Sequence, residues 1–491
     1  MKKSILKIFA VLALVSGMSS CGNEFLKTDY ASGIDVETGL NSVETLGTAL
    51  NGTYYRLFYY GFAGNYAISI GDIPTDLSYW NTKTGHWDKL YLYTHVDTDS
   101  YLSGIWNYGY KVIDNSSRII KAGKEIYATA TESEKPEIDL YIAEAYALRA
   151  YASLMLTNIF GHQIKVNGTD FSNELGIVVV DEPIEAYAEV QRSTVGQSYT
   201  AILNDFGAAL THFGAAGGDR GDLNYMNVAA VQGLMARTYL YMENWDSAIS
   251  SANAALASAG VTELAYTAAD YAGLFASGTS NVESFFALAI DSNNNWSANS
   301  CGTLWSTYNY SPSPKLLSMY GANDVRTSIF EWDVNSTPDT PIFKAGKFSH
   351  KSSGNSAYGT NYIVNAPEMF LTIAEAQAQN EQITAAQEAL LTVAKRNADI
   401  KTTADLPATK AEILTFIQDE RARELFQEGL RLYDLRRWDA KVSVGANKAP
   451  AISFAYNNYQ ISNLVYPIPA SEINAGFGVE QNASWSSVRP Q

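Results

Sequence analysis

Apolar side chains recur every three to four residues along most of the chain after residue 40, as they do on one face of an α-helix. Polar pairs that cap helix N-termini stand at the start of several of these stretches. They are Thr131 with Glu134, Thr194 with Gln197, Thr384 with Gln387, and Thr409 with Glu412. The pattern predicts helices over residues 41–58, 100–122, 131–160, 194–210, 227–242 and 245–259, and two more that begin near 384 and 409. We therefore expect a mainly α protein.

Two of the predicted helices, over residues 227–259, carry small side chains at the steps where paired helices touch. Ala236, Tyr239, Ala248 and Ala255 follow tetratricopeptide spacing, in which small residues let antiparallel helices approach and a ring fills the gap. Residues 368–397 repeat this spacing loosely. We expect a tetratricopeptide-like helical-repeat scaffold forming a single domain over residues 38–491, with loop-rich excursions and a few short strands. Strand candidates are residues 176–180, 285–290 and 452–461.

The stretch ERARELFQEGLRLYDLRRW, residues 420–438, combines an apolar helical stripe with a row of acidic side chains. Glu420, Glu424 and Glu428 stand four residues apart, and acids at that spacing repel one another unless cations lie close by. Gly429 lies on the apolar stripe and costs a helix about 1 kcal/mol relative to alanine, which predicts another backbone packed against it. We expect a helix that clamps its neighbours through ion pairs. The alternative is a solvated helix with surface salt bridges.

The N-terminus has the pattern of an export signal. Lysines at positions 2, 3 and 7 flank the start of an apolar segment, residues 8–17, that is too short to span a bilayer. Met18-Ser19-Ser20-Cys21 follows and resembles a bacterial lipobox, with methionine in place of the usual leucine. We expect residues 1–20 to be a lipoprotein signal peptide, Cys21 to carry the lipid anchor, and residues 21–37 to form a tether. The alternative is an ordinary signal peptide followed by a chance cysteine.

Charge narrows the range of partners. The formal charge is −17, and it becomes −20 once residues 1–20, with three lysines and no acidic residue, are removed. A surface this acidic repels polyanions, so we expect no nucleic-acid partner. It suits a neutral ligand or a protein. Since Cys301 is the only other cysteine, an acylated Cys21 would leave a chain stabilised by its core without disulfides.

Motifs for catalysis and metal binding are not found in the sequence. The histidines at 86, 95, 162, 212 and 350 include no pair four residues apart, and no GxSxG or glycine-rich phosphate loop occurs. The segment 291–295, DSNNN, opens like a calcium loop, but Trp296 and Gly302 stand where an EF-hand needs glycine and glutamate. We expect a non-enzyme without a cofactor, and a different calcium site stays open. A glycoside hydrolase is one alternative, because two carboxylates would suffice; an adaptor that binds only protein is another.

Six segments follow one another along the chain: EAYALRAYASLMLTNIFG (144–161), RSTVGQSYTAILNDFGAAL (192–210), AAVQGLMARTYLYMENWDSAI (229–249), PEMFLTIAEAQAQ (367–379), the 420–438 stretch and YPIPASEIN (466–474). In these segments and their order, the chain resembles the SusD/RagB family of Bacteroidota outer-membrane lipoproteins over nearly its whole mature length. Glu24 is similar to the acidic tag that directs such lipoproteins to the outer face, although the tag usually has more acids.

This resemblance implies a tetratricopeptide-based scaffold with ligand loops on one side. It implies a lipid-anchored protein of the outer membrane, exposed at the cell surface. It also implies a partner, a TonB-dependent barrel of the SusC type over which the lipoprotein acts as a lid. The ligand in this family is an oligosaccharide or, in a minority of members, a peptide, taken up without being cleaved.

Two stretches without a helical period, near residues 68–99 and 291–310, are the expected ligand loops. Flat rings suit the apolar C–H faces of sugars, and amides and hydroxyls suit their hydroxyl groups. The candidate ligand-binding residues are Asp76, Tyr79, Trp80, Asn81, Trp87, Trp296, Trp305 and Tyr308. The alternative for each ring is that it pins its own loop to the scaffold. Our hypothesis is that Trp80→Ala or Trp305→Ala weakens glycan binding and leaves the melting temperature nearly unchanged.

Overall fold

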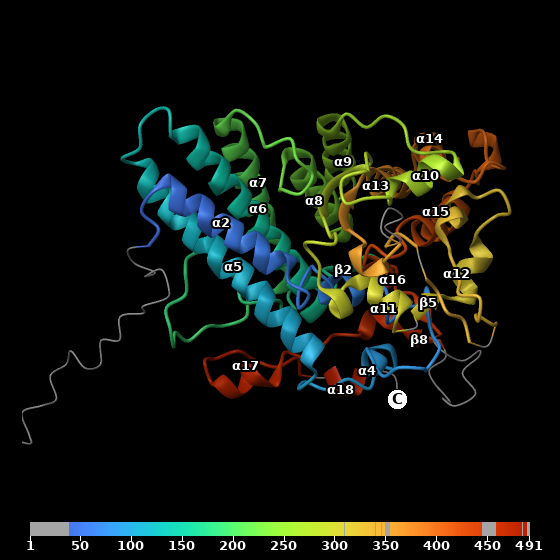
Figure 1. Ribbon diagram of the computed structural model, residues 1–491, viewed down its shortest axis with the longest axis horizontal. Helices are drawn as coiled ribbons and strands as arrows, with labels where there is room; N and C mark the ends of the chain where they lie inside the picture. The colour runs from blue at the N-terminus through green and yellow to red at the C-terminus, as the bar shows by residue number, and fades with distance from the viewer. Residues whose placement is uncertain are drawn as a thin grey trace, which may run out of the picture.

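The computed structural model describes residues 39–488, apart from 309, 339, 345, 349–353, 444–457 and 484. The predicted signal peptide, Cys21 and the tether lie outside the described residues. Figure 1 shows long helices towards one end of the molecule, and short helices, strands and loops towards the other. The described part is mainly α, with strands of two to five residues, as the sequence predicts. Within that part, no helix is long and apolar enough to cross a bilayer.

Four long helices carry the first half of the chain: α2 (Val43–Phe58), α5 (Ser100–Tyr127), α6 (Lys135–Phe160) and α7 (Val195–Ala216). Helix α6 packs against the other three and buries most of its side chains (Figure 1). The capping pair predicted for α7 is confirmed, because the Thr194 hydroxyl accepts the backbone N–H of Gln197. The predicted cap of α15 (Lys410–Glu424) is confirmed in the same way at Thr409.

Two antiparallel helix pairs continue the stack: α8 (Val228–Tyr241) with α9 (Trp245–Ala259), and α13 (Ala366–Gln379) with α14 (Ile383–Ala394). Ala236, Ala248 and Ala255 are fully buried in the first pair, where the sequence places small residues. Strand β4 (Ser284–Leu288) pairs antiparallel with β6 (Asn361–Asn365), which leads directly into α13. The predicted scaffold of paired helices and the strand predicted at 285–290 are thus confirmed.

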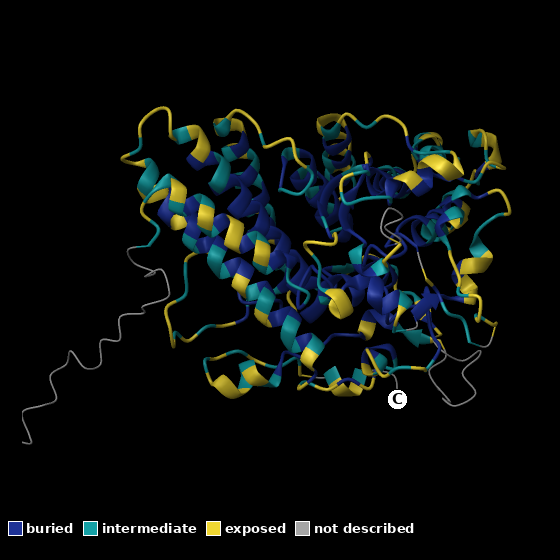
Figure 2. Ribbon diagram, in the orientation of Figure 1, coloured by how far each residue is buried: buried dark blue, intermediate teal, exposed yellow. Residues whose placement is uncertain are grey.

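The two predicted ligand loops meet in one small sheet. Strand β1 (Ser78–Trp80) lies in the first loop and β5 (Tyr310–Pro312) at the end of the second, and they pair antiparallel with Tyr79 opposite Ser311. The loops also hold the short helices α3 (Tyr66–Ser69), α4 (Asp88–Tyr91), η1 (Ser297–Asn299) and α11 (Cys301–Ser306). Figure 2 shows that much of this region is buried rather than solvated.

Short elements make up the rest. They are β2 (Lys165–Val166), β3 (Thr169–Asp170), α10 (Ala268–Leu274), α12 (Pro314–Met319), η2 (Val325–Ile329), η3 (Ser356–Tyr358), η4 (Thr403–Asp405), α16 (Arg431–Arg437), β7 (Lys441–Val442), β8 (Tyr459–Gln460), η5 (Ile461–Asn463), α17 (Ala470–Ala475) and α18 (Trp485–Val488).

Several predicted boundaries are wrong. Residues 176–180 form no strand, and of residues 452–461 only 459–460 form one, while 452–457 lie outside the described residues. Thr131 and Glu134 are hydrogen bonded, but the chain still turns there, and α6 begins afterwards with a proline in its first turn. Thr384 lies inside α14, which begins one residue earlier.

The helix expected over residues 420–438 is interrupted. Helix α15 ends at Glu424 and α16 begins at Arg431, and between them Gln427 and Gly429 have φ angles of 68° and 74°. The backbone predicted to pack against Gly429 is present, because a Cβ added at Gly71 would lie 1.9 Å from the Gly429 carbonyl oxygen. The chain turns at this point to pass the first ligand loop, so the helix cannot continue.

The acidic row of this segment forms the predicted clamp. Arg326 donates to Glu420 at 2.7 Å and to Glu424 at 3.1 Å, and Lys347 pairs with Glu428. All of these side chains are buried. Burial opposes the ionisation of Glu420, but the charges of Arg326 and Arg423 outweigh it and lower its pKa to about 2. The ion pairs therefore tie the distant segments around Arg326 and Lys347 to the end of α15 and to the turn that follows it, and the alternative of a solvated helix is excluded.

Candidate functional site

Three of the predicted ligand-binding tryptophans are core residues. Trp80, Trp87 and Trp305 are 6%, 2% and 3% exposed. The Trp80 indole N–H donates to the Thr84 carbonyl at 3.0 Å, and the Trp305 ring meets Phe426 edge-on at 4.9 Å. The prediction that these rings lie open to a ligand is corrected. They pin the two loops to the scaffold, which is the alternative drawn from the sequence.

The predicted polar contacts of the first loop are structural as well. Asp76 is 6% exposed and pairs with Arg431 at 2.9 Å and Lys315 at 2.5 Å. Burial disfavours its charge, but the two cations outweigh burial and hold the pKa of Asp76 below its usual range. Asn81 is 6% exposed and donates to the Pro341 carbonyl at 2.8 Å. Their prediction as ligand contacts is corrected, because both are committed to holding the loop.

The remaining three candidates reach the surface to different degrees. Trp296 and Tyr308 are half-buried, and Tyr79 is 7% exposed. The Tyr308 ring stacks on exposed His86 with centroids 3.7 Å apart. Tyr79 lines a separate hollow, described below. For these three, contact with a ligand stays a prediction.

Trp296 belongs to a row of surface rings, here named the aromatic strip. Its members are Tyr55, Tyr59, Tyr60, Tyr66, Tyr101, Tyr108 and Trp296. Tyr55 is 53% exposed and the other six are half-buried. The strip is continuous, since each ring has a neighbour in the strip within 5.9 Å between centroids.

The strip is built from four segments. The end of α2 and the turn after it supply Tyr55, Tyr59 and Tyr60, α3 supplies Tyr66, and α5 supplies Tyr101 and Tyr108. Trp296 comes from the second ligand loop and is fixed by its indole N–H, which donates to the Phe58 carbonyl at 2.7 Å. This bond joins the loop to the end of α2, so the Trp296 ring is held in place before any ligand arrives.

The surroundings of three strip tyrosines, Tyr59, Tyr66 and Tyr101, favour the protonated hydroxyl. A hydrogen bond with Tyr60, together with burial, raises the pKa of Tyr59, and burial raises the pKa of Tyr66 and Tyr101. A neutral phenol both donates and accepts hydrogen bonds. At one edge Lys111 lies over the Tyr108 ring at 4.3 Å. The strip therefore offers flat apolar faces bordered by neutral hydroxyl groups.

A hollow of about 330 Å³ continues from the exposed end of the strip. Tyr54, Tyr55 and Phe58 line one side, and Asn224 and Asn294 add amide groups. The Asn224 Oδ1 atom is buried and has no hydrogen-bond partner among the described residues.

The sequence contains a signal for the strip that periodicity conceals. Residues 54–60, YYRLFYY, hold five rings in seven positions. The predicted helix over residues 41–58 includes the first five of these positions, and α2 does end at Phe58, but a helix buries only one face and so must leave some of these rings at the surface.

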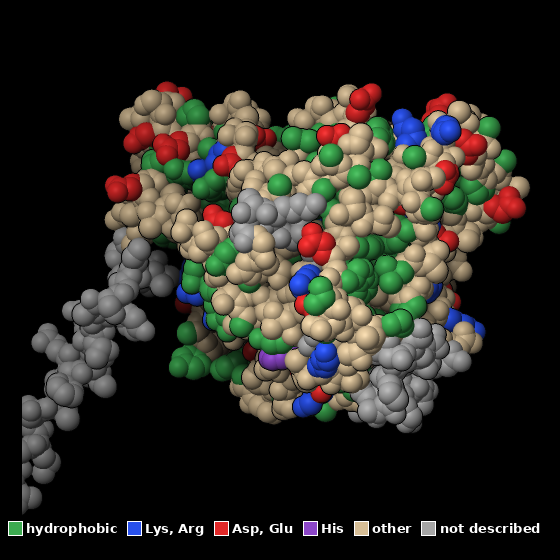
Figure 3. Space-filling view, turned by 45° about the vertical axis from the view of Figure 1, so that its right-hand side comes forward, with side chains coloured by type: hydrophobic (Ala, Val, Ile, Leu, Met, Phe, Trp, Pro, Cys, Tyr) green, Lys and Arg blue, Asp and Glu red, His purple; other side chains and the backbone are tan. Residues whose placement is uncertain are grey.

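On the face shown in Figure 3, acidic and basic side chains lie scattered, and hydrophobic side chains gather in a hollow right of centre. Among the described residues, no group of three or more His, Cys, Asp or Glu side chains could hold a metal ion.

Comparison with solved structures identifies the fold. The chain is 22% identical to a SusD superfamily protein from Bacteroides thetaiotaomicron VPI-5482, with a TM-score of 0.78 over 90% of this chain and 99% of that one. It is also 22% identical to a SusD superfamily protein from Bacteroides vulgatus ATCC 8482, with a TM-score of 0.77 over 91% of this chain and 99% of that one. A SusD-like carbohydrate binding protein from the same strain is 18% identical to the chain, with a TM-score of 0.68 over 82% of this chain and 84% of that one. No curated protein matches the chain.

Two family models match the sequence itself. One, described as "Starch-binding associating with outer membrane", matches residues 29–240. The other, described as "SusD family", matches residues 333–485. Together they include five of the six segments on which the resemblance rests and residues 229–240 of the remaining one, and the helical architecture agrees with them. The chain belongs to the SusD/RagB family.

Proposed function

We propose that this protein is a non-catalytic glycan-binding lipoprotein that passes oligosaccharides to a TonB-dependent outer-membrane transporter of the SusC type. The aromatic strip is the observation that carries the proposal. The family description matched by residues 29–240 names starch binding and association with the outer membrane, which supports a carbohydrate ligand in that location.

The physical case rests on what rings and sugars share. A pyranose ring has an apolar C–H face that packs on a flat aromatic ring, and its hydroxyl groups bond to neutral donors and acceptors at the edge. A continuous row of rings suits successive sugars of a chain better than one small molecule. The net charge of −17, or −20 after removal of the signal peptide, favours a neutral glycan over an acidic one.

Location and partner follow from the N-terminus and the family. Acylation of Cys21 would hold the protein on the outer membrane, and the tether 21–37 would let it close over a barrel. Mass spectrometry of protein from native membranes should find lipid on Cys21, and gentle solubilisation should co-purify a large barrel. Recovery of a Cys21 without lipid would remove the anchor from this proposal.

Binding is tested by calorimetry on the full chain purified from membranes in detergent. The probes are maltoheptaose and cello-, xylo- and manno-oligosaccharides of similar length. Trp296→Ala should weaken binding of the preferred probe about tenfold or more. The control is Tyr187→Ala, which removes a ring that is 85% exposed and outside the strip, and it should bind normally. Equal affinity in the Trp296→Ala and wild-type proteins would exclude the strip as the site.

The same purified protein distinguishes this function from two alternatives, a glycoside hydrolase and a peptide importer. Incubation with each oligosaccharide should release no shorter sugars, whereas release by the wild-type protein would favour a glycoside hydrolase. A peptide library that competes for the Trp296-dependent site would favour a peptide importer instead.

A further inference from the structure

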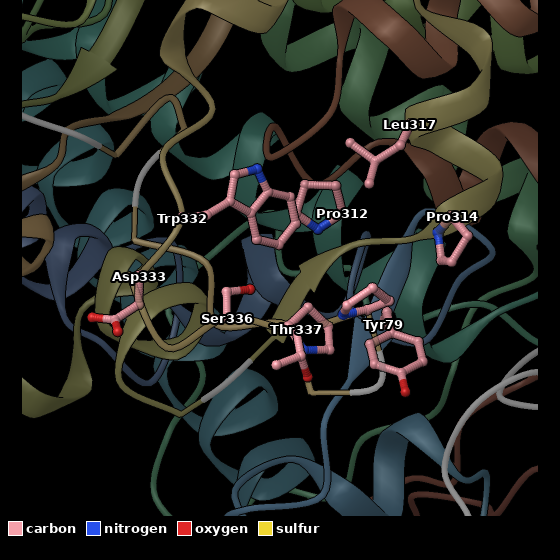
Figure 4. Close-up of a pocket in the computed structure, with 10 residues that line it drawn as sticks. Tyr79, Pro312, Pro314, Leu317, Trp332, Asp333, Ser336 and Thr337 are labelled. Atoms are coloured by element: carbon pink, nitrogen blue, oxygen red, sulfur yellow. The ribbon is translucent and has the colours of Figure 1, made fainter.

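A second hollow, of about 560 Å³, lies beside the β1–β5 sheet, outside the aromatic strip. Its apolar wall consists of Tyr79, Trp332, Leu317 and four prolines, which are Pro312, Pro314, Pro338 and Pro341. Figure 4 shows Trp332, Pro312 and Leu317 on one side and Tyr79 and Thr337 on the other. Trp332 is 36% exposed, so part of its ring remains free to pack on a ligand.

The walls of this hollow are fixed by contacts from distant parts of the chain. The Trp332 ring meets Phe343 at 5.2 Å, and Phe343 in turn packs on Phe330 at 5.8 Å. On the opposite side Asn81 donates to the Pro341 carbonyl at 2.8 Å, which joins the first ligand loop to the segment that follows Trp332. Prolines at four wall positions add backbone stiffness. The cavity is therefore largely formed before it is filled, which lowers the entropic cost of binding.

Apart from the Asp333 carboxylate, the polar side chains that line the hollow carry neutral hydroxyls. The Ser336 oxygen accepts the Ile342 N–H at 3.0 Å, and the Thr337 oxygen accepts the Thr340 N–H at 3.0 Å. Each hydroxyl has only one proton, and the acceptor role leaves that proton available to a ligand oxygen.

The one carboxylate of the lining is already engaged. Asp333 accepts the Asn335 N–H at 2.9 Å and faces Lys344 at 3.1 Å, and these contacts lower the pKa of Asp333. In Figure 4 its carboxylate points away from the other lining side chains. The hollow is thus suited to a neutral ligand with an apolar face and several oxygen atoms.

We propose that this hollow is a second carbohydrate subsite, in which one or two neutral sugar residues pack on Trp332 and bond to the Ser336 and Thr337 hydroxyls. The inference rests on the proposed glycan-binding function and adds a site to it. A proline-rich peptide is the competing ligand, since aromatic grooves also bind such segments. The hydroxyl protons and the engaged carboxylate favour the sugar.

None of the residues that line the hollow belongs to the aromatic strip. Tyr79 and Trp80 are neighbours in β1, and neighbouring side chains of a strand point to opposite faces. Tyr79 lines the hollow, while Trp80 packs against Tyr91 in the core at 5.9 Å. Each site therefore has its own tryptophan, Trp332 or Trp296, and the two can be observed independently.

The test uses the full chain in detergent with its nine tryptophans replaced by 5-fluorotryptophan. The fluorine resonances of Trp296 and Trp332 are assigned with Trp296→Phe and Trp332→Phe variants. Oligosaccharides released from starch, cellulose, xylan and mannan are added in turn, followed by a proline decapeptide. We expect at least one oligosaccharide to shift both resonances. In calorimetry, Trp332→Ala should weaken binding of the oligosaccharide that shifts the Trp332 resonance about tenfold. The control is Val334→Ala, at a residue that is 93% exposed and two positions away, and it should leave this binding unchanged.

The outcomes are distinct. A shift at Trp296 without any shift at Trp332 leaves the proposed function standing and overturns the second subsite. A shift at Trp332 alone supports the subsite and removes the strip. A Trp332 response confined to the proline peptide makes the hollow a peptide site, and silence of both resonances overturns both proposals.

Discussion

Arg431 donates two hydrogen bonds to Asp76, from Nε to Oδ1 at 2.9 Å and from Nη2 to Oδ2 at 3.0 Å, although the two residues lie 355 positions apart. Arg431 begins α16, and Asp76 lies two residues before β1. The pair therefore fixes the first ligand loop directly to the end of the scaffold. Both side chains are buried, so neither is available to a ligand.

Removing this cation should destabilise the protein. In Arg431→Met the Asp76 carboxylate stays buried beside Lys315 alone, and breaking a buried pair costs about 3–5 kcal/mol. Urea titration of the free energy of unfolding checks this. The matched control is Arg118→Met, which breaks a partly exposed pair with Asp114 and should cost about 0.5 kcal/mol or less. Equal losses in both variants would contradict a structural role for the Asp76 pair.

The close approach of Gly71 and Gly429 gives a second prediction. A Cβ at Gly71 would lie 1.9 Å from the Gly429 carbonyl oxygen, and Gly429 itself has a φ of 74°. Gly71→Ala should therefore lower the free energy of unfolding by about 3 kcal/mol or more, because both backbones must shift. Gly207→Ala is the control, with nothing within 4 Å of the added Cβ, and in helix α7 it should be neutral or stabilising by up to about 1 kcal/mol. A stable Gly71→Ala protein would show that the two segments can separate.

These contacts also explain what the sequence could and could not reveal. The cap at Thr194, the strand at 285–290 and the buried alanines of α8 and α9 depend on local spacing, and all of them are predicted correctly. The glycine on the apolar stripe correctly predicts a close backbone. The break in the 420–438 helix is missed, because helical spacing continues through Gln427 and only the passing loop makes the chain turn.

In the candidate site, too, features set by local sequence are predicted and features set by contacts between distant segments are not. Aromatic loops are identified from composition, but which rings face solvent depends on contacts across the fold. Trp305 is buried by Phe426, while Trp296 is held at the surface by the carbonyl of Phe58, 238 positions away. The tyrosines of α2 and α5 come to the strip from helices that the periodicity assigns to the scaffold.

The burial of Trp305 reverses our hypothesis about its replacement. Because the ring is 3% exposed and packs on Phe426, Trp305→Ala should lower the free energy of unfolding by about 3–5 kcal/mol and lower the melting temperature. Trp332→Ala is the control, because a ring that is 36% exposed loses less packing. Differential scanning calorimetry compares the two. A Trp305→Ala protein with an unchanged melting temperature and weaker glycan binding would restore the original hypothesis.

Asp72 gives a prediction about pH. It is 2% exposed, and burial raises its pKa to about 7, although the Gly429 N–H donates to it at 2.9 Å and favours the charged form. The unfolded chain gives up this proton near pH 4. Between about pH 4 and 7 the folded state therefore binds one proton more than the unfolded chain. The contribution of protonated Asp72 to the free energy of unfolding is fully present below that window and is lost as pH rises through it.

Asp72→Asn replaces the carboxyl group by a neutral amide and should flatten this decline. Melting temperatures measured between about pH 5 and 8 should fall less steeply with rising pH than in the wild-type protein. Asp76→Asn provides the opposite case, because the pKa of Asp76 is lowered and its ion pairs stabilise the fold at neutral pH. The melting temperature of this variant should therefore lie furthest below that of the wild-type protein at neutral pH. Parallel pH profiles for Asp72→Asn and wild type would mean that Asp72 is already charged in the folded protein, and that the two N–H donors from Gly429 and Arg431 outweigh its burial.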